Sequence, residues 1–153
     1  MFAPKPFRRT VRAALVLALF SAVAACEDST GVDDDDHQEA VGMVITNQNN
    51  QVLASVNAQR QVTGSLTVAA GQAQHLDIYF VDEDGDRFQI SDDDDEHSLG
   101  WAVANTAIAR IEGHDDHHDL DGVAAGNTTV VFSILHGNHS DYDSPQIPIT
   151  VTP

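Results

Sequence analysis

Two histidines with two residues between them, His136 and His139, close a β-branched and aromatic run near the end of the chain, and Asp141 follows them. Neutral imidazole binds zinc, copper and nickel well, and a carboxylate can complete or orient such a ligand set. Gly137 allows a tight bend, so both imidazoles can converge on one ion. This spacing indicates a transition-metal site, although a pair of solvated polar side chains has the same pattern.

Four further histidines lie in acidic stretches of the chain. His97 follows the run from Asp92 to Glu96, and the other three, His114, His117 and His118, flank Asp115 and Asp116. The last two histidines lie elsewhere: His37 is in an acidic segment near the start, and His75 is on the expected outward face of a strand. Whether these residues share one ion depends on how the fold places them.

The elements that must position these residues are β-strands. Apolar and polar residues alternate in short segments separated by turn signals, and no helical period appears after residue 25. Trp101 is expected on the inward face of a central strand. Over residues 64–153 the sequence predicts an all-β, antiparallel β-sandwich of about seven strands, and a hairpin over 41–63 precedes it. The expected strands are 65–69, 73–81, 99–104, 107–112, 119–124, 128–136 and 146–152.

Residues 64–151 resemble a bacterial immunoglobulin-like domain of the group found in intimin- and invasin-type surface proteins. The resemblance is carried by Ser65-Leu66-Thr67-Val68, by Trp101, by 105–111 (NTAIARI), by 122–130 (GVAAGNTTV) and by 149–151 (ITV). It implies an immunoglobulin-like sandwich that serves as a structural or adhesive module without catalysis. Two departures are the long acidic segment 82–98 and the histidines within 113–119, which the family pattern does not include.

In an immunoglobulin-like topology, the links after the second, fourth and sixth strands emerge at one end of the sandwich. These links are 82–98, 113–118 and 137–145, so we expect six of the eight histidines to gather at one pole. Zinc is the expected ion. Calcium is the second candidate, because 82–86 resembles a calcium-binding loop. An ordinary acidic turn, however, explains the sequence of 82–86 better. The predicted metal ligands are drawn from His97, His114, His117, His118, His136, His139 and Asp141.

Residues 1–25 have the pattern of a secretory signal peptide, with a basic start and an apolar run that ends in small residues. Val23-Ala24-Ala25-Cys26 resembles the lipobox of bacterial lipoproteins and predicts lipidation of Cys26, the only cysteine. Residues 26–40 are expected to be a disordered acidic tether. The protein is therefore expected in the bacterial cell envelope, on the outer membrane, facing either the periplasm or the cell surface. Its lipid is expected to be its only attachment to the membrane.

All 24 acidic residues but only three of the seven basic ones follow Cys26, so the surface repels nucleic acid and attracts cations. Phosphate loops, nucleophile elbows and zinc-protease helices are absent from the sequence, and no enzyme is expected. The sequence thus favours an envelope lipoprotein that captures or buffers a metal ion. The alternative is a structural or adhesive module whose acidic loops contact an envelope protein or calcium.

Overall fold

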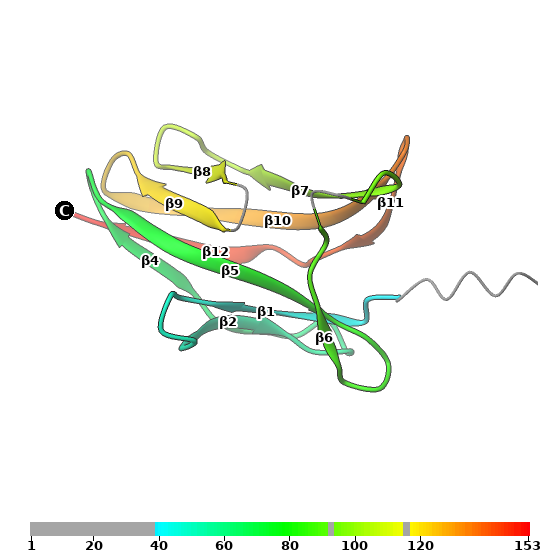
Figure 1. The fold of residues 1–153 in the computed structure, drawn as a ribbon. Helices are drawn as coiled ribbons and strands as arrows, with labels where there is room; N and C mark the ends of the chain where they lie inside the picture. Colours follow the sequence, from blue (N-terminus) through cyan, green and yellow to red (C-terminus); the bar gives the residue numbers. More distant parts are fainter. Residues whose placement is uncertain (1–38, 92–93, 115–116) are drawn as a thin grey trace, which may run out of the picture. The chain divides into compact units, whose positions relative to one another are not determined.

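The computed structural model describes residues 39–91, 94–114 and 117–153. The predicted signal peptide, Cys26 and the tether up to residue 38 lie outside these described residues. The described chain forms β-strands and contains no helix, and so none long and apolar enough to cross a membrane (Figure 1). The strands are β1 (Gly42–Thr46), β2 (Val52–Val56), β3 (Val62–Gly64), β4 (Leu66–Ala69), β5 (Ala73–Val81), β6 (Arg87–Phe88), β7 (His97–Val103), β8 (Ala109–Gly113), β9 (His118–Gly122), β10 (Gly126–His136), β11 (His139–Asp143) and β12 (Ile147–Thr152).

These strands form two sheets. The larger sheet has the order β3-β2-β1-β5-β9-β8, and β6 also pairs with β5. The smaller sheet has the order β11-β10-β12-β4, and β7 also pairs with β10. Every pairing is antiparallel except that of β12 with β4. The predicted fold class, an all-β sandwich of mainly antiparallel strands that begins with a hairpin, is confirmed.

One hydrophobic core lies between the sheets, and strand alternation explains which residues enter it. Every second residue of a strand points to the same face of its sheet. The apolar residues of β5 therefore point toward the smaller sheet, and those of β10 point toward the larger sheet. The longest stretches of this pattern contribute Leu76, Ile78 and Phe80 from β5, and Val130, Phe132 and Ile134 from β10. Other buried members are Met43, Ile45, Ala54, Val56, Leu66, Val68, Ala109, Ile111, Leu120, Tyr142, Ile147, Ile149 and Val151.

The N-terminal hairpin uses the same turn twice. In residues 47–51 and again in 57–61, the first residue is Asn and the fifth is Gln, and their backbones and side-chain amides bond to each other. The fourth residue has a left-handed backbone, with φ of 58° at Asn50 and 61° at Arg60. Each turn satisfies its own polar groups, which lets three strands follow one another within 23 residues (42–64).

The acidic segment after β5 forms a turn that is held by a side-chain carboxylate and backbone N–H groups. Oδ1 of Asp82 accepts hydrogen bonds from the backbone N–H groups of Asp84 (3.1 Å) and Asp86 (2.8 Å). The turn leads into β6, a two-residue strand that is too short for its pattern to be visible in the sequence. The carboxylate of Asp82 is therefore used by the turn itself, as the acidic-turn interpretation of 82–86 predicts.

The prediction that Trp101 lies in the core is wrong. Its side chain is 36% exposed on β7, an edge strand of the smaller sheet. Its indole Nε1 donates a 3.1 Å hydrogen bond to the carbonyl oxygen of Ile111 on β8, an edge strand of the larger sheet. Alternation gives the face on which a side chain lies, but not whether the opposite sheet extends far enough to cover it. Trp101 spans one open side of the sandwich.

Candidate metal centre

Three neighbouring strands each supply one histidine at the same end of the smaller sheet. His97 begins β7 and pairs with His136 at the end of β10, and His136 pairs in turn with His139 at the start of β11. Residues directly opposite each other in a sheet present their side chains on the same face. In the two-residue loop between β10 and β11, Gly137 has a φ of 57°, which glycine adopts without strain. The tight bend predicted at Gly137 is therefore present.

A carboxylate lies among these rings. Asp141 is two residues beyond His139 and is the unpaired residue where the register of β10 and β11 shifts, so a β-bulge places its carboxylate beside the histidines. Its Oδ2 is 3.5 Å from Nε2 of His97 and 3.5 Å from Nδ1 of His136, and its Oδ1 is 3.0 Å from Nε2 of His139. One nitrogen of His97, one of His136 and one oxygen of Asp141 all lie within 4.8 Å of one another. These three residues form the candidate metal centre, which we call the β10 site.

Asp94 orients the most buried histidine of the β10 site. The side chain of His97 is 17% exposed, and its Nδ1 is 3.2 Å from Oδ2 of Asp94. When Nδ1 carries the proton and donates it to Asp94, the lone pair of His97 is on Nε2, which faces Asp141. The backbone N–H groups of His97 and Glu96, which donate to Oδ1 of Asp94, hold the pKa of this carboxyl below its usual value. Asp94 is thus an ionised acceptor.

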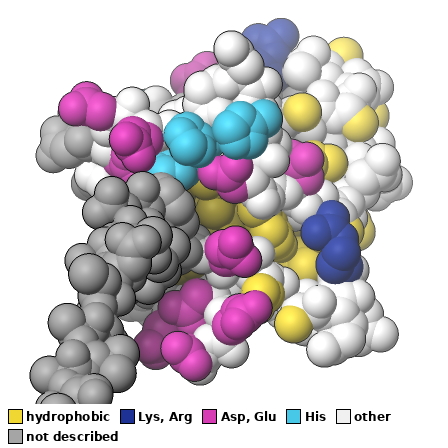
Figure 2. All heavy atoms as spheres, turned by 90° about the vertical axis from the view of Figure 1, so that its right-hand side faces the viewer, with side chains coloured by type: hydrophobic (Ala, Val, Ile, Leu, Met, Phe, Trp, Pro, Cys, Tyr) yellow, Lys and Arg dark blue, Asp and Glu magenta, His cyan; other side chains and the backbone are white. Residues whose placement is uncertain are grey.

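The β10 site opens onto a cleft of about 840 Å³. Acidic and imidazole groups line one part, and apolar side chains from β6, β10 and β11 line another. Figure 2 shows histidines and acidic side chains gathered on this face, with hydrophobic side chains visible in the hollow below them. The cleft leaves the β10 site accessible from solvent. Its described lining is Glu39, Ala40, Phe88, Gln89, Ile90, Asp94, Glu96, His97, Ile134, His136, Asp141 and Tyr142.

A second group of histidines lies on the larger sheet. His75 on β5 is the cross-strand partner of Asp119 on β9, and His117 immediately precedes β9. Each of these three residues offers one ligand atom, and the three atoms lie within 4.8 Å of one another. The rings of His75 and His117 are stacked with centroids 4.4 Å apart, and those of His117 and His114 are stacked at 4.8 Å. We call His75, His117 and Asp119 the β9 group.

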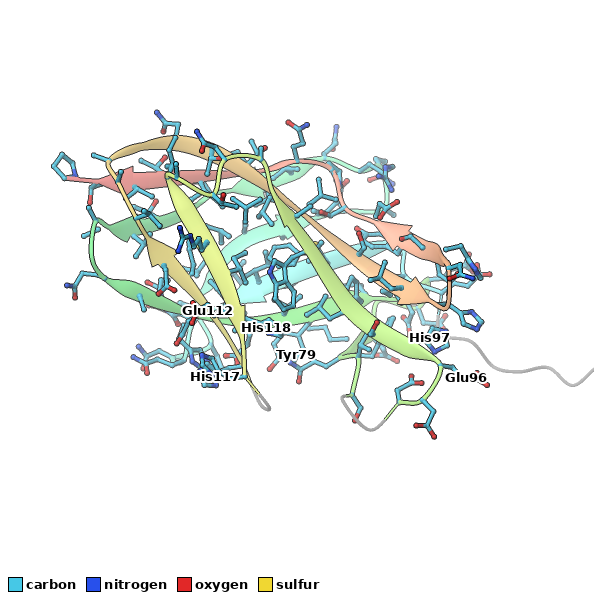
Figure 3. All side chains as sticks on the ribbon, turned by 90° about the horizontal axis from the view of Figure 1, so that it is seen from above. Tyr79, Glu96, His97, Glu112, His117 and His118 are labelled. Carbon is cyan, nitrogen blue, oxygen red and sulfur yellow. The ribbon has the colours of Figure 1, made fainter. Side chains whose placement is uncertain are left out.

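The expectation of one pole with six histidines is therefore wrong. Figure 3 shows His97 at one end of β7 and His117 well away from it, next to the start of β9. His118 pairs with Leu76 in the middle of β5, because the end of that edge of β5 is occupied by β6. His117 and His118 therefore lie away from the end of the sandwich where β10 and β11 meet. His117 stacks on His75 instead, and His114 stacks on His117.

The predicted ligands divide accordingly. The β10 site brings together three predicted residues, His97, His136 and Asp141, and His139 contacts the same carboxylate from a more exposed position. His117 belongs to the β9 group, and His114 contacts Asp119 at 3.5 Å. His118 lies in neither group, since its ring packs edge-on against Trp101 with centroids 5.0 Å apart.

Sequence reasoning misses three residues of these clusters: Asp94, His75 and Asp119. For His75 a signal exists, because His75 and Asp77 alternate with apolar residues on β5 and so share the outward face. Asp119 could be found only by knowing that β9 pairs with β5 and in which register. Asp94 lies in an acidic run whose members are indistinguishable by sequence alone.

Comparisons with known proteins add little to this geometry. No protein-family model matches the chain, and no curated protein matches it. Among solved structures, the chain is similar to domains 4 and 5 of the S-layer protein SbsC, with 20% sequence identity and a TM-score of 0.40. This match covers 60% of this chain and 49% of the SbsC chain. For domains 5–6 the identity is 21% and the TM-score 0.40, with 59% and 40% covered. The chain thus spans about half or less of these neighbours, and a TM-score at this level carries no argument about function.

Proposed function

We propose that this protein binds a transition-metal ion, most readily zinc, in the β10 site, with His97, His136 and Asp141 as donors. The observation that carries the proposal is the position of Asp141. Two donors of one tetrahedral zinc ion lie about 3.4 Å apart when zinc–ligand distances are about 2.0–2.1 Å. Asp141 Oδ2 is 3.5 Å from a nitrogen of each of the two histidines, close to that spacing. His139, whose Nε2 is 3.0 Å from Oδ1 of Asp141, is the candidate for a fourth donor.

The donor set favours transition metals over calcium. Two imidazoles and one carboxylate suit zinc, copper(II) or nickel, whereas calcium takes about 6–8 oxygen ligands. The chain has one cysteine, Cys26, so thiolate ligation that would favour copper(I) does not enter. The surroundings of the donors are also suitable, because Asp94 accepts a hydrogen bond from His97 as carboxylates do behind metal-bound histidines.

The setting of this site is part of the proposal. The sequence of residues 1–26 supports export and lipid attachment at Cys26, and the acidic composition supports attraction of cations. The role that fits both is capture or buffering of the ion at the cell envelope. Delivery of the ion to another envelope protein would use the same open cleft.

The test is zinc binding to the full chain, measured by calorimetry and by competition with a chromophoric chelator. We compare the parent with His97→Ala/His136→Ala, and His118→Gln serves as a matched control that alters a histidine outside both groups. The double variant should lose the ion held by the β10 site, whereas the control should retain it. Calcium at the same concentration should not displace zinc.

A second arm separates imidazole from carboxylate binding. Protons compete with metal for imidazole nitrogens in mildly acid solution, so zinc affinity should fall steeply between pH 7.5 and pH 5.5. Binding by carboxylates alone would persist at pH 5.5, and calcium would then compete well. Unchanged zinc binding by His97→Ala/His136→Ala would overturn the proposed site and leave the adhesive-module alternative.

A further inference from the structure

We propose that the β9 group, His75, His117 and Asp119, is a second transition-metal site on the larger sheet. It shares no residue with the β10 site, and its existence does not depend on that site. The protein would then hold two ions per chain, one on each sheet. The ligand class is the same, a divalent transition metal with nitrogen and oxygen donors.

Strand pairing fixes two of the three donors. His75 and Asp119 are directly opposite each other in the antiparallel ladder of β5 and β9, so their side chains share the outward face. The third donor, His117, immediately precedes β9, and its carbonyl oxygen accepts a 2.8 Å hydrogen bond from the backbone N–H of His114. The backbones of all three donors are thus fixed, two by the ladder and one by a hydrogen bond next to it.

The hydrogen bond of His75 suits ligation by this residue, and binding of one ion by both rings requires one of the stacked imidazoles, His75 or His117, to rotate. Nε2 of His75 is 3.0 Å from Oδ1 of Asp77, its neighbour on the same face of β5. A proton on Nε2 donated to Asp77 leaves the lone pair on Nδ1, so Asp77 stands to His75 as Asp94 stands to His97. Both clusters thus pair a histidine with a carboxylate behind it, although they lie on different sheets.

The distances require only modest closure. The three donor atoms lie within 4.8 Å of one another, and donors of one zinc ion are about 3.4 Å apart, so closure needs shifts on the order of 1 Å together with rotation of one stacked ring. His117 and His75 are each 26% exposed, and Asp119 is 29% exposed, so the donors are partly withdrawn from water yet reachable. His114 Nε2, 3.5 Å from Asp119, is available as a fourth donor.

The decisive experiment counts ions on the full chain by zinc titration against a chromophoric chelator. The parent should bind two ions. His75→Ala/His117→Ala should bind one, His97→Ala/His136→Ala should bind one, and the combined fourfold variant should bind none tightly. His118→Gln is the matched control, because it changes the histidine next to His117 without removing a proposed donor. This variant should still bind two ions.

The outcomes separate the two proposals. One ion that is lost only with His97→Ala/His136→Ala would overturn the second site and leave the proposed function standing. One ion that is lost only with His75→Ala/His117→Ala would do the reverse. Two ions retained by His75→Ala/His117→Ala would also overturn the second site. Circular dichroism without metal checks that each variant is folded.

An independent readout covers the case in which His75→Ala/His117→Ala does not fold. Trp101 is the only tryptophan, and its ring packs against His118, the neighbour of His117. Copper(II) bound in the β9 group should therefore quench its fluorescence, and it should do so in His97→Ala/His136→Ala. An ion in the β10 site is farther away, because His97 is four residues along β7, about 13 Å at about 3.3 Å per residue. Absence of quenching in His97→Ala/His136→Ala would count against the second site.

Discussion

Asp94 acts on the proposed β10 site without being one of its donors. It accepts from Nδ1 of His97 and is itself fixed by two backbone N–H groups. Partners of this kind set the tautomer and the ring orientation of a metal-bound histidine, and their loss commonly weakens metal binding. The contribution of Asp94 can be separated from its charge, because Glu96 offers a comparable acidic side chain two residues away.

Asp94→Asn should weaken zinc binding by about 10–100-fold. The amide keeps an oxygen for the backbone N–H groups but cannot replace both carboxylate oxygens as acceptors. Glu96→Gln removes the same charge without touching His97 and should change affinity far less. Calorimetry on the two variants decides the matter, and equal losses would show that the effect is only one of net charge.

Asp143 provides a test of the fold that does not involve metal. The hydroxyl groups of Ser133 and Ser140, whose oxygens are 2.6 Å and 2.9 Å from Oδ1 of Asp143, lower the pKa of this carboxyl. A carboxyl with a lowered pKa in the folded state stabilises the fold above its unfolded pKa of about 3.9, and this contribution is lost as pH falls through the folded pKa.

Asp143→Asn should therefore be less stable than the parent at pH 7, and the difference should shrink as pH falls below about 4. Thermal melts at a series of pH values from neutral to strongly acid measure this. A difference that stays constant over the whole range would mean that the hydrogen bonds, and not the ionisation of Asp143, carry the contribution.

At the scale of elements, strand pairing decides which predictions succeed. All seven predicted strands are present, with bounds within two residues, because alternation and turn residues are local signals. β11 was not predictable in the same way: among its five residues only Tyr142 is apolar, and the pairing comes from the two-residue turn at Gly137. His139 and Asp141 consequently lie on a strand and not in a loop. Register is not local, and so the grouping of His75 with His117 is not readable from sequence.

Trp101 shows the same limit for packing. Trp101→Phe keeps an aromatic ring on β7 but removes the donor to Ile111, so it should cost about 1 kcal/mol of unfolding free energy. Phe132→Ala, which empties a fully buried position, should cost about 3–5 kcal/mol. Urea denaturation of both variants tests this order. A loss from Trp101→Phe as large as that from Phe132→Ala would place the indole in the core after all.

At the scale of the whole molecule, attachment to a membrane remains a prediction from sequence, because Cys26 lies outside the described residues. The composition of 1–25 is a strong local pattern, and it requires no tertiary structure to be recognised. The two histidine clusters are the opposite case. They are assembled from residues far apart in sequence, 75 with 117 and 97 with 136, and only the pairing of strands brings these residues together.

Cys26→Ser should abolish lipid labelling and move the protein from the membrane fraction to the soluble fraction. The reason is that the thiol is the atom to which lipid would be attached, and a hydroxyl does not replace it. Fractionation of cells that produce the parent or Cys26→Ser, followed by detection of the protein, measures the change. Continued membrane association of Cys26→Ser would contradict the lipoprotein assignment.

The two copies of the repeated turn in the N-terminal hairpin differ in their contacts with the rest of the molecule, and so they should differ in how they tolerate an insertion. Among the described residues, the hydrogen bonds of 47–51 stay within that turn. Arg60, in the second copy, reaches across the molecule and donates a 2.7 Å hydrogen bond to the carbonyl oxygen of Asp143 on β11. A peptide tag inserted after Asn49 should thus leave metal uptake unaffected, whereas the same tag after Gln59 should loosen β11, which carries Asp141. The first turn is the place to attach a label, and the second is the place to tune the β10 site from a distance.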